Sequence, residues 1–188
     1  MRRRLAWRLA LPAVLFLLRA PLEAGMSVQM LVQIPLLVAA GALLAGALPP
    51  RPLAAVQQWN AQGVSGLVLA TLAILPWMLP LSLDAAASRP IVDGARHLAL
   101  PLLAGVPLAL GWRRAGFVVR GVFLLELVAS CFRLGWLYLA APVRLCNNYG
   151  LGDQQRLGQG LLMLGAALVT WIGLALLIPS RQTRRSCN

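Results

Sequence analysis

The chain is dominated by long apolar segments separated by short polar ones, and this pattern restricts the fold more than any other feature. The clearest segment, 26–48, has about 23 residues, enough for a helix to cross a hydrocarbon core of ~30 Å. Apolar residues make up 60% of the chain and charged residues only 12%, against about 25% charged in soluble domains. Because lipid offers no partner to backbone polar groups, such segments form helices. We predict an all-α, polytopic transmembrane helix bundle.

Six apolar segments indicate about six spans, and arginine sets their orientation. The net charge of +12 comes from arginine alone, since the chain contains no lysine. Arginine accumulates on the cytoplasmic side of membrane proteins, which predicts that both termini are cytoplasmic. No compact basic domain remains outside the spans, so membrane lipids, and not nucleic acid, are the expected partners. The six segments are residues 9–18, 26–48, 61–82, 97–112, 116–141 and 157–178.

The two ends of the chain differ from the part between them. Residues 1–25 combine a basic start with a short apolar run, which predicts either a retained first span or a signal-like segment. Arg19 lies so close to the apolar run that it favours retention. Residues 26–178 then form the transmembrane bundle, and residues 179–188 form a basic cytoplasmic tail.

Two prolines lie inside the fourth apolar segment. Pro101 and Pro107 each remove a helical hydrogen bond, so we expect this span to be kinked or discontinuous. The charged stretch that precedes it, 82–96, is expected to be a polar loop on the outer side.

Three polar helix ends meet the outer face under this topology, and the start of the second span is the first of them. Met26, Met30 and Gln33 are spaced i, i+4 and i+7, which places them on one helix face. Thioethers are soft ligands that select Cu(I). Methionine also packs well in irregular helix contacts, so a packing role is the alternative interpretation.

The start of the fourth span carries the only histidine of the chain, His97. Asp93 precedes it by one helical turn and could orient the imidazole for metal binding or proton transfer. A solvated histidine at the membrane interface is the alternative. One histidine needs other ligands to hold a metal, and Met26, Met30 and Cys146 are predicted on the same side.

The fifth span contains ionisable residues inside an apolar stretch. Glu126, Ser130 and Arg133 are spaced i, i+4 and i+7 and share a face. Ionisable groups within a bilayer pair with each other or line a polar cavity. A Glu126–Arg133 pair, with Arg120 bonded to another helix, is the simplest interpretation, and a proton or ion path is the functional one.

The turn between the fifth and sixth spans adds Asp153 and Gln154 as supporting polar residues before a glycine-rich helix start. The acidic residue also favours a helix N-terminus, which is the structural interpretation. No nucleophile–base arrangement, phosphate-binding loop or HExxH motif is present, and the three cysteines form no CxxC pair. The sequence therefore predicts no enzyme activity.

Short motifs along residues 26–178 resemble the CtaG-like family, polytopic bacterial proteins associated with assembly of copper-containing cytochrome c oxidase. Most family histidines are absent, which leaves open a thioether-rich copper site or a relative that kept the fold and lost the metal. The motifs are residues 30–37 in place of a His-Met-x-x-His start, Trp59-Asn60 in place of Trp-His, Arg96-His97 with Gly105 and Trp112, and Asp153-Gln154 with Gly158 and Met163.

The first functional hypothesis is the one that the resemblance implies. The protein would be a bacterial inner-membrane assembly or accessory factor for a respiratory copper oxidase, with an oxidase subunit as partner. It would transfer Cu(I) at the outer face by ligand exchange, using Met26, Met30 and His97 with Cys146 and Asp93 in support.

Two other hypotheses remain open. One is a non-catalytic structural subunit of a multi-subunit membrane complex, packing through small-residue faces such as Gly41/Ala45. The other is a small carrier or proton-conducting protein that works through Arg120, Glu126 and Arg133.

Overall fold

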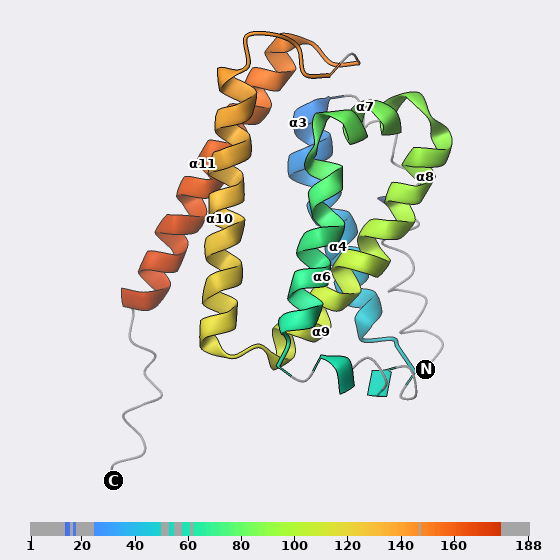
Figure 1. The fold of residues 1–188 in the computed structure, drawn as a ribbon, viewed down its shortest axis with the longest axis vertical. Coiled ribbons are helices and arrows are strands. Elements are labelled where there is room, and N and C mark those ends of the chain that lie inside the picture. The colour runs from blue at the N-terminus through green and yellow to red at the C-terminus, as the bar shows by residue number, and fades with distance from the viewer. Residues whose placement is uncertain are drawn as a thin grey trace.

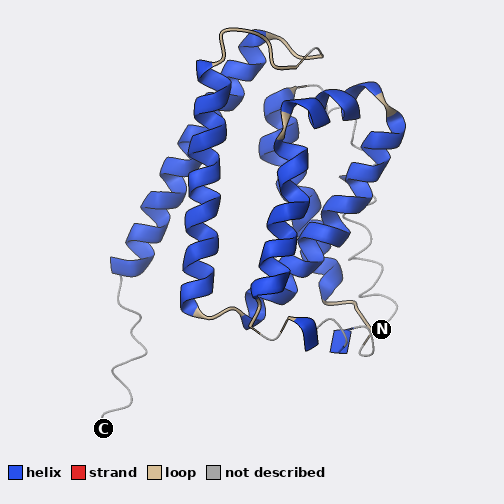
Figure 2. Ribbon diagram, in the orientation of Figure 1, coloured by secondary structure: helices blue, strands red, loops and turns tan. Residues whose placement is uncertain are grey.

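The chain folds into a bundle of helices, which confirms the predicted fold class (Figure 1). The computed structural model describes residues 14, 15, 17, 25–49, 53, 54, 58–60, 62–146 and 148–177. Within this part of the chain all regular structure is helical and no strand is present (Figure 2). The expected first span, most of residues 1–25, and the basic tail lie outside the described residues.

The described elements follow one another in a simple order. The helix over Met26–Ala45 is continuous and contains a π-helical turn. The elements are α3 (Met26–Val28), η1 (Gln29–Gln33), α4 (Ile34–Ala45), α6 (Val64–Ile74), η2 (Leu75–Met78), α7 (Pro80–Ser88), α8 (Pro90–Ala99), η3 (Leu100–Gly105), α9 (Val106–Arg114), α10 (Phe117–Ala140) and α11 (Leu151–Leu177).

Three described helices are long and apolar enough to cross a membrane: Met26–Ala45, Pro90–Arg114 and Leu151–Leu177. A fourth span is possible by the same measure if Val64–Met78 and Pro80–Ser88, which are bent by 68°, count as one. The lengths and apolar character of these helices are those of a multi-pass membrane protein. The number of six spans and the cytoplasmic location of both termini remain predictions. Helix α10 has 24 residues but contains three ionisable side chains.

The prolines do not interrupt the fourth span. The helix runs continuously from Pro90 to Arg114, so of the two predicted alternatives, kinked or discontinuous, the span is not discontinuous. Its middle is the π-helical segment η3, with Pro101 near its start. A π-turn shifts the hydrogen-bond register, and this shift accommodates a residue without an N–H.

The stretch 82–96 is helical and not a polar loop, because it forms the end of α7 and most of α8. Helix α8 has its polar side inside: Asp93 and Arg96 are buried, while Ile91 and Leu98 are 85% and 67% exposed. This inversion is the arrangement expected where the surroundings are lipid. It explains why a charged stretch is packed into the bundle.

Glycines set the closest helix contacts. A Cβ on Gly41 of α4 would collide with the carbonyl group of Pro101 in η3, and a Cβ on Gly105 would collide with the carbonyl oxygen of Val38. Only glycine permits this approach of two backbones. The face containing Gly41, which the structural-subunit hypothesis assigns to a partner helix, is therefore used inside the chain.

Helices α10 and α11 form an antiparallel pair beside the other helices (Figure 1). The loop that joins them, 141–150, reaches back to α7, where the Asn148 backbone N–H donates to Asp84 Oδ1 at 2.9 Å. This loop, the start of α3 and helix α8 lie at the same end of the bundle, called the loop end below (Figure 1).

Candidate functional site

A group of buried polar side chains occupies the loop end. They come from three segments that are far apart in sequence, namely η1, α8 and the loop 141–150. We call this group the polar cluster: Gln29, Gln33, Asp93, Arg96, His97 and Tyr149, each at most 9% exposed. Buried polar groups are costly unless they are bonded to each other. The bonds within the cluster therefore decide what it can do.

An ion pair forms the centre of the polar cluster. Arg96 Nη2 lies 2.5 Å from Asp93 Oδ1, and their side chains are 1% and 6% exposed. The Gln29 amide lies against the same guanidinium, which can only donate, so the amide oxygen faces Arg96. The amide nitrogen then donates to Tyr149 Oη at 3.0 Å. These added bonds compensate for removing two charges from water.

The second half of the polar cluster fixes the imidazole of His97. Its Nδ1 lies 3.0 Å from the carbonyl oxygen of Asp93 and 3.1 Å from Asp93 Oδ1. Both are acceptors, so Nδ1 carries the hydrogen and the Nε2 of the neutral ring accepts. Nε2 lies 3.3 Å from Gln33 Nε2, which donates to it. The expected orientation of His97 by Asp93 is present, and the lone pair of Nε2 points toward η1.

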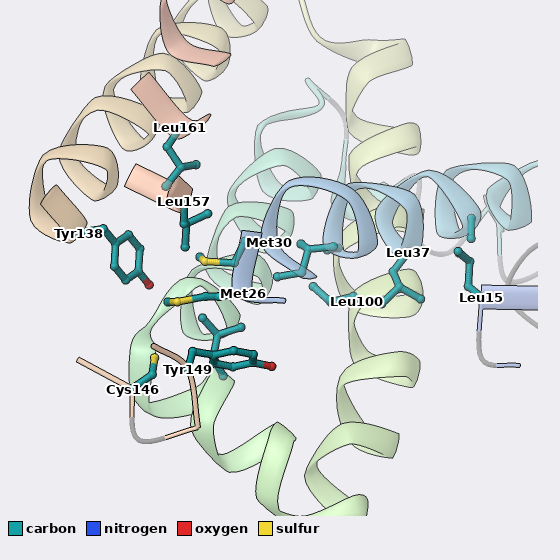
Figure 3. Packing of buried hydrophobic residues seen from close by; sticks show 14 residues of the cluster. Leu15, Met26, Met30, Leu37, Leu100, Tyr138, Cys146, Tyr149, Leu157 and Leu161 are labelled. Carbon is teal, nitrogen blue, oxygen red and sulfur yellow. The ribbon is translucent and has the colours of Figure 1, made fainter. Parts of the chain in front are cut away.

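The predicted soft ligands gather beside the polar cluster. Met26, Met30 and Cys146 are 0%, 2% and 2% exposed and belong to one apolar core. Figure 3 shows the two methionine side chains and Cys146 directed into the same part of that core, near Tyr138 and Tyr149. We call these three residues the sulfur cluster. His97 does not belong to this core, and it bonds to Asp93 and Gln33.

Cys146 is held as a neutral thiol. Its Sγ donates to the carbonyl oxygen of Pro80 at 3.5 Å. Burial raises the pKa of the thiol to about 11, and the nearby negative charge of Asp84 adds to the shift. Metal ligation by this residue therefore requires displacement of a proton.

The two supporting residues of the last turn do not join the polar cluster. Gln154 is buried but holds the loop: its Oε1 accepts from the Leu145 backbone N–H at 2.9 Å, and its Nε2 donates to the Tyr138 carbonyl at 3.2 Å. Asp153 is partly exposed and lies 3.7 Å from Arg156. Gln154 therefore positions the segment that carries Cys146, while Asp153 has a local role.

The charged face predicted for the fifth span is present on α10. Arg133 pairs with Glu126 and donates to Ser130 Oγ at 3.2 Å. Arg120 is not part of this group, because its guanidinium donates to the Trp112 carbonyl at 3.2 and 2.9 Å and lies over the Trp112 ring. The expectation that Arg120 bonds to another helix is confirmed, and its bonds to Trp112 separate it from the Glu126–Arg133 pair.

Three residues of the polar cluster have no predicted role. Gln29 stands at the start of the second span, where an isolated amide inside an apolar run is itself a signal of an internal partner. Arg96 is spaced i, i+3 from Asp93, which indicates a pair, but its charge favours a solvated position. Nothing in the sequence connects Tyr149 to Gln29.

Asn60, which stands in the place of a family histidine, has a structural role. Its Oδ1 accepts from the Gly66 backbone N–H at 3.1 Å and from Ser65 Oγ at 3.2 Å at the start of α6. A carboxamide oxygen satisfies helix N–H groups in this way. Asn60 therefore does not contribute to a metal site at the loop end.

No family model, curated protein or solved structure matches the chain. The CtaG-like resemblance therefore stays a prediction. Among the described residues, no three side chains of histidine, cysteine, aspartate or glutamate are grouped as metal ligands. A metal at the loop end would depend on thioether sulfur, which binds soft ions only.

Proposed function

We propose that this protein is a membrane accessory factor that binds Cu(I) at the loop end and passes it on by ligand exchange. The observation that carries the proposal is the sulfur cluster. Met26 and Met30 lie one helical turn apart, and Cys146 comes from a loop more than a hundred positions later, yet all three are buried in one core. Two thioethers and a thiol are a soft donor set that suits Cu(I) and not hard ions.

The surroundings of the sulfur cluster suit a cargo that must be both held and released. The apolar shell excludes water, and the neutral thiol of Cys146 adds no uncompensated charge before the ion arrives. Binding of Cu(I) would displace the thiol proton, and reprotonation would favour release. The His97 imidazole, fixed by Asp93, has its Nε2 directed to Gln33 of η1 and is a fourth candidate donor if it exchanges that hydrogen bond for the ion.

The destination of the copper rests on the resemblance and not on the geometry. The CtaG-like motifs support a bacterial inner-membrane location and a respiratory oxidase subunit as recipient. Under the predicted topology the loop end faces the outer side, where such a recipient would accept the ion. Transfer between ligand sets requires no bond-making catalysis, so the proposal assigns no enzyme activity.

Copper content tests the proposal. The protein is purified in mild detergent under reducing conditions, supplied with Cu(I), and analysed for copper per chain. The wild type should retain about one ion, and Met26→Leu with Met30→Leu should lose it, because leucine keeps the volume but removes the soft donor. Met163→Leu is the matched control, since Met163 is 72% exposed on α11.

The single variants divide the ligand set. Cys146→Ser should weaken copper retention. His97→Gln should weaken it as well if His97 is a direct ligand, and should leave it unchanged if His97 only orders η1. Wild-type protein without copper, or the double methionine variant with unchanged copper, would refute the proposal. Oxidase level in cells carrying the double methionine variant then tests the recipient.

A structural subunit of a larger membrane complex is the second candidate function. The observation that favours it is the exposed charged face of α10. An ion pair exposed to lipid is unfavourable, so such a face is expected where another protein covers it. Co-purification of a stoichiometric partner in mild detergent would support this candidate, and a solitary protein would count against it.

A further inference from the structure

An exposed face of α10, on the side of α6, combines charges with an apolar groove. Glu126 and Arg133 have side chains that are 47% and 63% exposed. Glu126 also lines a groove of about 360 Å³ between α6 and α10. The other lining residues used below are Val68, Thr71 and Leu72 of α6 and Val119 and Val122 of α10. This surface is remote from the sulfur cluster and does not depend on the proposed copper function.

The ion pair lies deep in the expected span. Glu126 is about 14 Å from the start of α10 and about 21 Å from its end, at 1.5 Å per residue. Arg133 is about 10 Å from the end, close enough to extend its side chain toward the nearer interface. It extends instead toward Glu126 and the middle of the span. The pair is therefore held at a depth where lipid supplies no hydrogen-bonding group.

The pair does not satisfy its own hydrogen-bonding capacity. Arg133 uses only Nη2, which bonds to Glu126 and Ser130, so within the described part of the chain its Nε and Nη1 donors have no partner. Arginine has five N–H donors and no acceptor. Groups in this state are unfavourable inside a bilayer, which is why they are found against protein. Among the described residues, the pair therefore lacks a hydrogen-bond acceptor for the remaining N–H groups of Arg133.

We propose that the groove between α6 and α10 is the docking site of a transmembrane helix from a different protein, and that this helix carries a carboxylate, carboxamide or hydroxyl acceptor opposite Arg133. The exposed valines and leucines of the two lining helices supply the apolar contact. Val122 and Leu72 are both 62% exposed and lie on opposite sides of the groove. The Glu126–Arg133 pair then fixes the depth and register of the bound helix.

Two other occupants fit the surface less well. A lipid carries its acceptors at the headgroup and ester level, above the depth of Glu126. A second copy of this chain would bring one more guanidinium for each carboxylate, so the excess of donors over acceptors would be unchanged. A foreign helix with an acceptor side chain is the occupant that removes the excess.

Site-specific photo-crosslinking in the native membrane tests the proposal. A benzophenone side chain replaces Leu72 or Val122 in the groove, and Leu102 on the exposed side of η3 serves as the control position. Both groove positions should crosslink to the same foreign membrane protein at least tenfold more than the control does. The crosslinked peptide, identified by mass spectrometry, should be an apolar segment that contains an acceptor side chain.

A second experiment removes the two charges and repeats the crosslinking. Glu126→Leu with Arg133→Leu should reduce the crosslink at least fivefold, while Met163→Leu on α11 should leave it unchanged. Equal abundance and a monodisperse elution profile for both variants show that the fold is retained. Crosslinks only to lipid, only to a second copy, or equally strong without the charges would overturn the proposal. So would a crosslinked peptide that lies in a soluble domain.

Discussion

The protein contains two acid–arginine pairs, and they are placed in opposite ways. Asp93 and Arg96 of α8 lie inside the bundle, with side chains 6% and 1% exposed. Glu126 and Arg133 of α10 lie on its outside, with side chains 47% and 63% exposed. Each pair joins one acidic residue to one arginine within a single helix, so the difference does not come from the residue types. The difference comes from the direction of each charged face: that of α8 faces other helices of the bundle, and that of α10 is exposed.

The inner pair is completed by the chain itself. Gln29 bonds to Arg96, His97 bonds to Asp93, and Gln33 bonds to His97, so the polar side chains of η1 and α8 bond to one another. The outer pair finds only Ser130 among the described residues. A complete network stabilises one arrangement of its own helices, whereas an incomplete network in lipid requires another molecule. This contrast predicts different responses to removal of each arginine.

Removal of the inner arginine should have the largest effect. Arg96→Leu leaves Asp93 buried without its main counter-charge, so unfolding in mild detergent with added SDS should show a loss of about 3–5 kcal/mol. Arg89→Leu, at an exposed position, is the matched control. Asp93→Asn combined with Arg96→Leu should lose less than the two single variants together, because the unpaired charge is absent. An Arg96→Leu variant as stable as the control would show that the pair is not essential to the fold.

The next effect is a pH dependence that belongs to the sulfur cluster. The pKa of Cys146 is raised from 9.0 to about 11 in the folded protein. Between these two pH values the unfolded chain has lost the thiol proton while the folded chain retains it. The contribution of this thiol to the free energy of unfolding is therefore fully present below pH 9 and is lost as the pH rises toward 11. Cys146→Ala should flatten this decline in SDS unfolding measured across the range.

Alkylation measures the same thiol directly. In a background with Cys131→Ala and Cys187→Ala, the rate of reaction with iodoacetamide should rise until about pH 11, because only the thiolate reacts. Asp84→Asn removes the second cause of the shift and should move the midpoint to lower pH. A midpoint near 9 in the folded protein would contradict the burial of Cys146.

The smallest effect belongs to the outer pair. Glu126→Leu with Arg133→Leu should change the stability of the isolated protein by no more than about 1 kcal/mol, because the pair is exposed and its bonds lie within α10 alone. The same variant should sharply reduce partner crosslinking in the membrane. A large loss of stability in the isolated protein would mean that the outer pair holds the fold, and the contrast between the two pairs would fail.

Helical spacing explains what the sequence alone could predict. The i, i+4, i+7 spacing of Glu126, Ser130 and Arg133 places them on one face, and the structure bonds them to one another. The spacing of Asp93 and His97 likewise predicts their contact. These contacts are local, so the period of one helix is sufficient to find them.

Burial of Arg96 could not be predicted in the same way. The stretch 82–96 has the charge content of a solvated loop, and only the packing of α8 against η1 shows that its polar side faces inward. Tyr149 meets Gln29 across more than a hundred residues, and no local pattern records that contact. The close packing of Gly105 in η3 against α4 likewise joins residues far apart in the sequence.

X-ray absorption at the copper edge tests the central claim most directly, namely that the sulfur cluster holds Cu(I). The protein is loaded with Cu(I) in mild detergent, and the first coordination shell is compared among the wild type, Cys146→Ser and Met26→Leu with Met30→Leu. We predict a shell dominated by sulfur in the wild type, with less sulfur in Cys146→Ser and no bound copper in the methionine variant. A shell of nitrogen or oxygen, unchanged by these substitutions, would contradict the account and move the search for function to the partner of α10.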